Sequence, residues 1–175
     1  IDTRGDVVAF GSRVLDKSEP KYMNSSETPV YSKRRVLYGL NLAKKSKRPN
    51  IILCEGNLDI VTLHQAGFDN AVASMGTALT VEQTRLLSRF TKELVLCYDN
   101  DNAGKIATER ALQILNGSEF SVKVLQLPRR LVDGEYIKQD ADDFIKLQGP
   151  DAFERLLNGS ENGVEFRMTQ IAARY

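Results

Sequence analysis

Residues that build disulfide frameworks and zinc sites are scarce in this sequence. Its 175 residues include two cysteines, Cys54 and Cys97, and one histidine, His64. Both cysteines lie inside apolar, strand-like runs, which favours buried thiols in a reducing compartment over a disulfide bond or a zinc site. No motif pairs His64 with a nucleophile, so we expect a surface or packing role for this side chain rather than a catalytic one.

Long apolar runs are also missing. No run approaches the roughly 20 residues that a membrane-spanning helix needs, and no secretory signal opens the chain. The hydrophobic fraction of 42% and the charged fraction of 27% are ordinary for a soluble globular protein. The chain opens on Ile1 instead of methionine and ends inside a helical pattern, so we expect a segment of a longer protein.

The net charge of +1 hides an uneven distribution of charge along the chain. Residues 1–49 contain 11 Lys or Arg against 5 Asp or Glu, whereas the remaining residues contain 13 against 18. A basic segment that grips a phosphate-rich partner, followed by an acidic body that binds metal ions, would produce this asymmetry. Ordinary scatter of surface charge would produce it equally well.

From residue 50 onward, short apolar runs alternate with helical patterns. Strands are predicted at 51–54, 70–75, 93–98 and 121–127. Helices are predicted at 58–67, where Gly67 ends the helix, at 80–90, where Thr80 and Gln83 form a capping box, and after the third strand. The last of these helices is expected to bury one face, made of Ala103, Ile106, Ala107, Ala111 and Ile114. This rhythm predicts an α/β fold with a parallel sheet covered by helices.

The first 49 residues follow a different pattern. Residues 6–16 resemble a hairpin with Gly11 at or near its turn, and residues 21–33 are irregular and polar. Residues 34–47 predict a basic helix with Leu37 and Leu40 on its apolar side.

The last part of the chain predicts a loop followed by helices. After Pro128, residues 129–139 are expected to form a long polar loop. Three short helices follow, at 142–149, 150–159 and 161–175. The whole chain contains no repeat and no low-complexity tract.

Three acidic clusters follow the apolar runs. Glu55 ends the first predicted strand, Asp99 and Asp101 end the third, and Asp140 and Asp142 come after the fourth. Functional groups gather at the carboxyl ends of parallel strands, and residues two apart in extended chain point the same way. Carboxylates gathered there would repel one another unless cations lay among them, and hard oxygen ligands suit Mg²⁺ or Mn²⁺.

Helix capping is the alternative for each cluster taken alone. Asn100, Asp101 and Asn102 are all suited to start the helix at Ala103, and Asp142 is suited to cap the helix at Phe144. Glu55 can be a solvated strand end. Taken together, three clusters at matching strand ends favour metal binding. A calcium-binding EF-hand loop is excluded because its later ligand positions fall on Ala103 and Arg110.

Several stretches resemble a known family. Glu-Gly at 55–56 and Asp-x-Asp at 99–101 resemble the TOPRIM domain of primases, topoisomerases and some nucleases. The stretches "VVAFGSRVLD", "PKYMNSSET", "LYGL", "AVASMGTALT", "LCYDNDNAGKIATERAL" and "DADDFI" resemble bacterial DNA primases of the DnaG type, in order over roughly residues 4 to 157.

This resemblance implies a fragment of a primase RNA polymerase core with a TOPRIM-type, mostly parallel sheet covered by helices. Residues 1–49 would be the C-terminal part of a basic α+β subdomain, residues 50–145 the TOPRIM domain, and residues 146–175 the start of a helical subdomain. The enzyme would synthesise RNA primers from nucleoside triphosphates on single-stranded DNA in the bacterial cytoplasm, associated with the nucleoid. Its replicative helicase partner would bind a C-terminal domain outside this chain.

The resemblance also implies the roles of individual residues. Glu55, Asp99 and Asp101 would be catalytic. Two or more Mg²⁺ or Mn²⁺ ions, and no zinc, would be held by Glu55, Asp59, Asp99, Asp101, Asp140 and Asp142. Nucleotide phosphates and the template would be bound by Arg13, Lys21, Tyr22, Asn24 and Lys33.

The sequence departs from the family pattern at four places. Asn57 replaces an aromatic residue, Asn100 stands where glycine is common, Ala141 replaces proline, and the loop at 128–139 is longer than usual. None of these departures removes a carboxylate, so we expect metal binding to survive. Topoisomerase- or nuclease-like phosphodiester chemistry, or a non-catalytic module that binds nucleic acid or nucleotides, are the alternatives.

Overall fold

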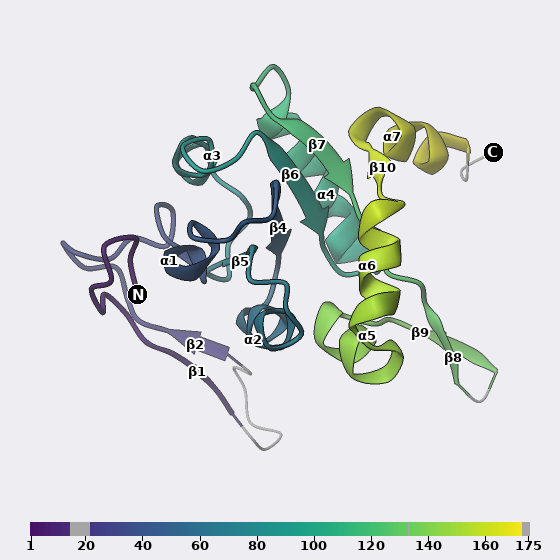
Figure 1. The fold of residues 1–175 in the computed structure, drawn as a ribbon, viewed down its shortest axis with the longest axis horizontal. Coiled ribbons are helices and arrows are strands. Elements are labelled where there is room, and N and C mark those ends of the chain that lie inside the picture. The colour runs from purple at the N-terminus through teal and green to yellow at the C-terminus, as the bar shows by residue number, and fades with distance from the viewer. Residues whose placement is uncertain (15–21, 133, 173–175) are drawn as a thin grey trace.

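A six-stranded sheet forms the centre of the molecule in the computed structural model, which describes residues 1–14, 22–132 and 134–172 (Figure 1). The strand order is β10-β7-β6-β4-β5-β3, with the four inner strands parallel and the two edge strands antiparallel to their neighbours. The strands are β3 (Leu37–Tyr38), β4 (Asn50–Cys54), β5 (Ala71–Ser74), β6 (Glu93–Cys97), β7 (Ser121–Val124) and β10 (Glu161–Asn162). The predicted α/β class with a mostly parallel sheet is therefore confirmed.

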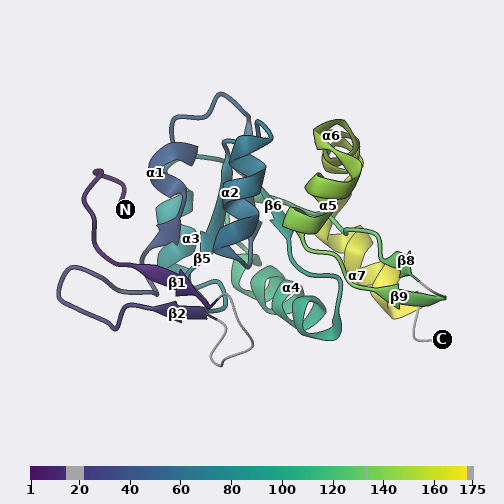
Figure 2. The ribbon, with the colours of Figure 1, turned by 90° about the horizontal axis from the view of Figure 1, so that it is seen from below.

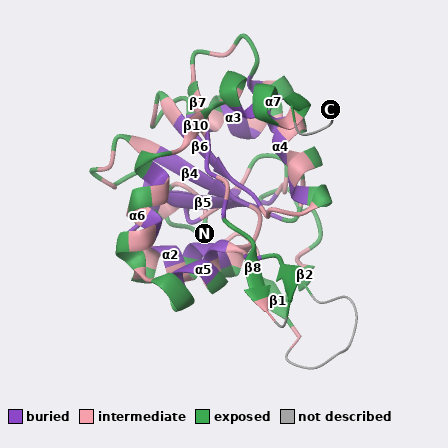
Figure 3. Ribbon diagram, turned by 90° about the vertical axis from the view of Figure 1, so that its right-hand side faces the viewer, coloured by how far each residue is buried: buried purple, intermediate pink, exposed green. Residues whose placement is uncertain are grey.

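Successive side chains of an inner strand point to opposite faces of the sheet, so the apolar residues form two cores, one on each face. In β4, Ile51 and Leu53 belong to one core, whereas Ile52 and Cys54 belong to the other. The first core also contains residues of α3 (Val81–Leu87), α4 (Asn102–Leu115) and α7 (Gly163–Ala172). The second contains residues of α2 (Asn57–Gln65), α5 (Ala141–Gln148) and α6 (Pro150–Asn158). Because helices cover both faces, β4, β5 and β6 are buried along almost their whole length, as Figure 3 shows, whereas β7 is buried only at Val124.

Two of the predicted signals at helix ends, the capping box at Thr80 and the glycine at position 67, are confirmed. The Thr80 side chain accepts the N–H of Gln83, and the Gln83 side chain accepts the N–H of Thr80, each at 3.1 Å, which closes the capping box of α3. Gly67 adopts a positive φ of 92° just after α2, a conformation that glycine tolerates and other residues rarely adopt. The three predicted helices near the end of the chain are present as α5, α6 and α7, although residues 173–175 lie outside the described residues.

The long basic helix predicted over 34–47 is wrong. This segment instead forms β3, which pairs with β5, and the four-residue helix α1 (Leu40–Ala43). Gly39 separates the two with a φ of 81°, and a Cβ at this position would lie 2.8 Å from Cγ2 of Ile60. Leu37 and Leu40 are buried as predicted, but Leu37 lies in the edge strand β3 and only Leu40 lies in a helix, the short α1.

The hairpin predicted within residues 6–16 is also wrong. Strand β1 (Gly11–Arg13) pairs antiparallel with β2 (Tyr22–Asn24), so Gly11 lies within a strand opposite Asn24 and not at a turn. Part of the predicted hairpin falls on residues 15–21, which lie outside the described residues. The segment 21–33, predicted to be irregular, therefore contains one of the paired strands.

The buried face of α4 differs from the predicted one. Its buried residues are Gly104, Thr108, Ala111, Leu112 and Leu115, whereas Ala103 and Ile106 are exposed. The first turn of the helix lies against the backbone of Asp99, since a Cβ on Gly104 would be only 2.0 Å from the Asp99 carbonyl oxygen. This close approach fixes which side of α4 faces the sheet, and apolar spacing alone did not predict it.

The polar loop predicted over 129–139 is a second hairpin. Strands β8 (Arg130–Val132) and β9 (Glu135–Ile137) pair antiparallel. Figure 1 shows the β1–β2 and β8–β9 hairpins on opposite sides of α2 and α5, and the view from below in Figure 2 agrees.

The scarce residue types are placed as the sequence predicted. Cys54 and Cys97 are free, buried thiols at paired positions of β4 and β6. His64 is partly buried, and its Nε2 lies 2.9 Å from the Ala71 carbonyl oxygen, a packing role. Among the described residues, no helix is long and apolar enough to span a membrane.

Strands from both ends of the chain join the central sheet. Strand β3 comes from residues 1–49, and β10 comes from residues 146–175. These strands connect all three segments to one sheet. The predicted domain boundaries at residues 49 and 145 stay predictions.

Candidate metal centre

A cavity of about 670 Å³ lies between the carboxyl ends of the parallel strands and the β1–β2 hairpin. The acidic side of this cavity is lined by Glu55, Asp59, Asp99, Asp140, Asp142 and Asp143. The opposite side includes Arg13, Tyr22 and Asn24. Residues from three acidic clusters and from the basic first segment, distant in the sequence, are thus brought to one cavity.

Glu55 occupies the first position after β4 and is partly buried. Its Oε1 is buried and has no hydrogen-bond partner among the described residues. Burial and the nearby charge of Asp99 raise the pKa of the Glu55 carboxyl. A buried, unpaired carboxylate oxygen is costly unless a cation or a donor meets it.

Asp59 lies in the first turn of α2 and is 7% exposed. Its Oδ2 accepts the N–H of Gly56 at 3.1 Å and its Oδ1 accepts the N–H of Asp142 at 3.2 Å. These bonds fix the carboxylate between two of the acidic clusters. Burial, with the charge of Asp140 as a further cause, raises the pKa of Asp59 to about 7.

The turn after β6 presents Asp99 and Asp101 to a single lysine. Asp101 caps α4 by accepting the N–H of Gly104 at 2.8 Å through Oδ1. The Nζ of Lys138 lies 3.1 Å from Oδ2 of Asp99 and 3.1 Å from Oδ2 of Asp101. The pKa of Asp101 is lowered, first by the hydrogen bond from Gly104 and then by the one from Lys138. The carboxylates of Asp101 and Asp99 in turn raise the pKa of Lys138.

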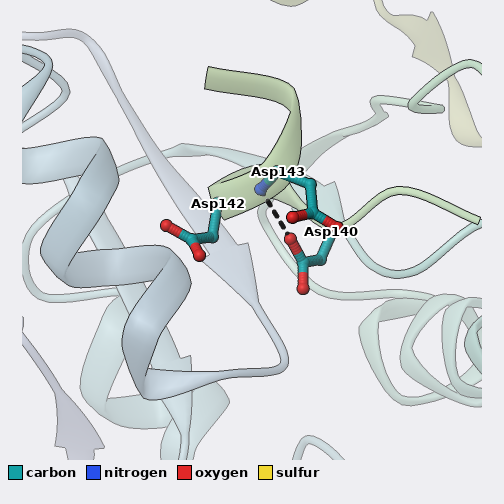
Figure 4. A group of neighbouring side chains, drawn as sticks. All are labelled: Asp140, Asp142 and Asp143. Carbon is teal, nitrogen blue, oxygen red and sulfur yellow. Dashed lines mark hydrogen bonds between the residues drawn. The ribbon is translucent and has the colours of Figure 1, made fainter. Parts of the chain in front are cut away.

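The third cluster surrounds the first turn of α5 (Figure 4). Asp140, Asp142 and Asp143 each offer an oxygen within 4.8 Å of those of the other two. Asp140 caps the helix by accepting the N–H of Asp143 at 2.7 Å, whereas Asp142 accepts from Thr62 of α2 and, at 2.6 Å, from Lys146. Burial acts to raise the pKa of Asp142, but the bonds from Lys146 and Thr62 outweigh it and the pKa is lowered.

Helix capping accounts for only part of this arrangement. Asp101 caps α4, as the alternative interpretation predicted, but the cap position of α5 is occupied by Asp140 and not by the predicted Asp142. Each capping carboxylate uses Oδ1 for the cap and leaves Oδ2 outside it, although Oδ2 of Asp101 accepts from Lys138. Capping and metal binding are therefore compatible at these residues.

The opposite side of the cavity contains three of the five predicted phosphate and template contacts. The guanidinium carbon of Arg13 lies 5.7 Å from the centre of the Tyr22 ring, a cation–π contact that holds the two side chains together. Asn24 donates through Nδ2 to the Met75 carbonyl at 3.4 Å, which links β2 to the loop after β5. Lys33 is not among the described residues that line the cavity, and Lys21 lies outside the described residues.

Three residues of the site were not predicted from the sequence. Asp143 is the third acid of "DADD", whereas the resemblance implies a metal-binding role only for Asp140 and Asp142. Gly104 gave a signal too, because glycine in the first turns of a helix is unfavourable without a packing reason. Lys138 gives no signal in the sequence, because its position depends on the β8–β9 hairpin and the sequence predicts a loop there.

The residues present fit divalent cations. All the candidate ligands are carboxylate oxygens, the donor type that Mg²⁺ and Mn²⁺ prefer. The buried, unpaired Oε1 of Glu55 and the raised pKa of Asp59 both indicate carboxylates that lack the positive charge that would stabilise their ionised forms.

Two family models match the chain. The Toprim-like model matches residues 52–145, and the model of the DNA primase catalytic core, N-terminal domain, matches residues 1–44.

Similar proteins are named DNA primase. A DNA primase from Clostridium acetobutylicum is 42% identical over 170 residues, which are 97% of this chain and 27% of that protein. A DNA primase from Pasteurella multocida is 42% identical over 177 residues, covering 98% of this chain and 29% of that protein. The chain thus spans less than a third of the length of these relatives.

Solved structures with the same fold include primase catalytic domains. The Aquifex aeolicus primase, with its zinc-binding and RNA polymerase domains, superposes with a TM-score of 0.82 at 40% identity, covering 94% of this chain and 40% of that one. A DNA primase domain from Pseudomonas aeruginosa gives a TM-score of 0.86 at 36% identity, covering 99% and 53%. A DnaG primase catalytic domain bound to single-stranded DNA gives 0.84 at 35% identity, covering 99% and 54%.

Proposed function

This chain belongs to the Toprim-like family and, within it, to the bacterial DNA primases of the DnaG type, and from that premise we propose that it forms part of the catalytic core of an enzyme that synthesises RNA primers. The reaction would join nucleoside triphosphates on a single-stranded DNA template in the bacterial cytoplasm. The observation that supports this proposal best is the cavity in which carboxylates from three acidic clusters face Arg13, Tyr22 and Asn24.

The acidic side of the cavity is the proposed metal centre. Two or more Mg²⁺ or Mn²⁺ ions would be held by Glu55, Asp59, Asp99, Asp140 and Asp142, which line the cavity, and by Asp101, which is not among the described residues that line it but shares with Asp99 the contact with Lys138. Asp143 would be an additional ligand close to Asp140 and Asp142. Bound there, divalent ions would neutralise charge on the attacking and leaving oxygens of a phosphoryl transfer. Glu55, with its unpaired buried oxygen, is suited to accept the proton of the attacking 3′-hydroxyl or to hold an ion. We assign Glu55, Asp99 and Asp101 the catalytic role.

The basic side of the cavity is the proposed contact for triphosphate and template. Arg13 offers a forked donor for phosphate oxygens, and Tyr22 offers a ring on which a base or ribose can stack. Lys33 would extend this contact beyond the cavity, and Lys21, which lies outside the described residues, stays a predicted contact. Solved relatives support the template assignment, since one catalytic domain is bound to single-stranded DNA and another to double-stranded DNA with a 6-nucleotide overhang. The helicase contact would lie in a domain outside this chain.

Binding of a fluorescent ribonucleoside triphosphate, followed by anisotropy in Mn²⁺ and in EDTA, tests the proposal. We expect binding that requires Mn²⁺ and that weakens more than about tenfold in Asp99→Asn, because a lost charged ligand to a metal–phosphate site is worth more than about 1.4 kcal/mol. Asp151→Asn, an exposed acid in α6, is the matched control and should bind as the wild type does. Binding that is equal in EDTA, or unchanged in Asp99→Asn, would favour a module whose acids only cap helices.

A further inference from the structure

The base of the β8–β9 hairpin is attached to the Asp99–Asp101 turn from both of its arms. On the entering arm, Nδ2 of Asn100 donates to the Leu127 carbonyl at 2.8 Å, and Nε of Arg129 donates to the Asn100 carbonyl at 3.3 Å. On the returning arm, Nζ of Lys138 donates to both carboxylates of the turn. Two departures from the family pattern, the asparagine at 100 and the longer segment at 128–139, are therefore in direct contact with each other.

Lys138 occupies the place between the two carboxylates where a cation is expected. Its Nζ is 3.1 Å from an oxygen of Asp99 and 3.1 Å from an oxygen of Asp101. The Lys138 side chain is 58% exposed, and Lys138 is among the residues that line the cavity. The ammonium is thus near the proposed metal centre, in contact with water, and within the same cavity as the proposed triphosphate contacts.

We propose that Lys138 is a built-in counterion of Asp99 and Asp101, that a divalent cation must displace it to bind there, and that the displaced ammonium then contacts the phosphates of the triphosphate in the cavity. This inference rests on the proposed function of the same site. Lys138 would stabilise the carboxylate pair while no ion is bound, and would add positive charge for the substrate once one is.

The strength of the contact suits an exchangeable counterion. Ion pairs at this exposure contribute little to stability, and a lysine is a compact charge on a flexible stem, so the side chain can leave at small cost. Several carboxylates attract a divalent ion more strongly than they attract one ammonium, so the divalent ion should displace Lys138 from Asp99 and Asp101. The anchored hairpin base keeps the displaced ammonium close to the cavity.

The other lysine beside an acid of the site is placed differently. Lys146 contacts Asp142 four residues away on the same helix, a common surface pair in helices. It contacts one carboxylate and does not bridge two, and it is not among the described residues that line the cavity. Only Lys138 combines the bridge with the cavity among the described lysines.

Calorimetric titration of this 175-residue chain with Mn²⁺ tests the displacement. Lys138→Met removes the ammonium and keeps the length of the side chain, so we expect it to bind Mn²⁺ about three- to tenfold more tightly than the wild type, the factor that corresponds to two exposed ion pairs. Lys138→Arg retains the charge and should stay near the wild type. Lys123→Met is the control for net charge, because Lys123 pairs with Glu93 at the opposite end of β6.

A second titration tests the contact with substrate. With Mn²⁺ saturating, Lys138→Met should bind a ribonucleoside triphosphate about three- to tenfold more weakly, the opposite sign to its effect on Mn²⁺. Equal Mn²⁺ affinity in the wild type and in Lys138→Met, or equal tightening in Lys123→Met, would overturn the counterion role. If wild type and Lys138→Met both fail to bind Mn²⁺, the metal centre itself is wrong, and this inference is overturned along with the proposed function.

Discussion

At the scale of single residues, the carboxylate of Asp59 is held out of water while it accepts backbone hydrogen bonds from Gly56 and Asp142. Those bonds favour the ionised form, but burial and the charge of Asp140 outweigh them and raise the pKa of Asp59 to about 7. Glu55 is perturbed in the same direction and for the same leading reason. The ionised form of each acid therefore destabilises the folded state unless a cation is present.

This shift predicts how stability depends on pH without metal. Because the folded pKa of Asp59 is raised above its unfolded value near 3.8, the folded state holds the proton more strongly, and its stability falls as pH rises between these values. From pH 5 to pH 7.5 in EDTA, we expect the free energy of unfolding to fall by on the order of 2 kcal/mol, an effect of Asp59 that Asp59→Asn should largely remove. Asp101 and Asp142, whose pKa values are lowered, contribute stability that is lost only at more acidic pH.

Urea unfolding of the wild type, Asp59→Asn and the exposed control Asp151→Asn at several pH values measures this slope. Added Mn²⁺ should abolish the loss at high pH in the wild type. A wild-type slope that survives in Asp59→Asn would assign the titration to another group.

At the scale of elements, the start of α4 is positioned by a glycine that lies against the preceding strand end. A Cβ on Gly104 would be 2.0 Å from the carbonyl oxygen of Asp99. The helix that Asp101 caps and the turn that carries Asp99 are therefore fixed relative to each other. The same close approach turns Gly104, Thr108 and Ala111 toward the core.

Gly104→Ala tests this packing. Alanine is the better helix former, but the overlap with Asp99 should dominate and lower the free energy of unfolding by about 3 kcal/mol, while displacing Asp99 and weakening Mn²⁺ binding. Gly159→Ala is the matched control, because the nearest atom to its Cβ would be 3.5 Å away. Chemical denaturation and Mn²⁺ titration of both variants measure the two effects, and a Gly104→Ala protein as stable as Gly159→Ala would contradict the packing argument.

At the scale of the whole molecule, the first segment is tied to the sheet by hydrogen bonds from one buried amide. Nε2 of Gln83 in α3 donates to the carbonyls of Lys33 and Val36, each at 3.0 Å. Strand β3 then adds the edge of the sheet, paired with β5. These contacts hold the basic side of the cavity near the acidic side.

Gln83→Glu should disrupt this connection. The carboxylate has no N–H to donate and would face two carbonyl oxygens in a buried position, so we expect a loss of about 3 kcal/mol in the free energy of unfolding. Gln113→Glu, on the exposed side of α4, should be close to neutral. Hydrogen exchange of residues 33–38, measured by mass spectrometry, should rise in Gln83→Glu only; unchanged exchange would show that other contacts hold the segment.

The sequence predicted those parts of the molecule that depend on local patterns. Buried apolar runs marked β4, β5 and β6, and from them followed the shared edge at which Glu55 and Asp99 lie. What it did not predict depends on contacts between distant segments. The close approach of Gly104 to Asp99 rotates α4, pairing with β5 converts residues 37–38 from helix to strand, and the β8–β9 hairpin returns Lys138 to the acidic turn.

Anomalous diffraction from manganese-soaked crystals of this chain, with and without a ribonucleoside triphosphate, tests the central claim most directly. The account predicts manganese peaks among Glu55, Asp59, Asp99, Asp101, Asp140 and Asp142, with triphosphate oxygens beside them and the ammonium of Lys138 moved away from Asp99. A site without manganese in both crystals, with Lys138 still between Asp99 and Asp101, would contradict it.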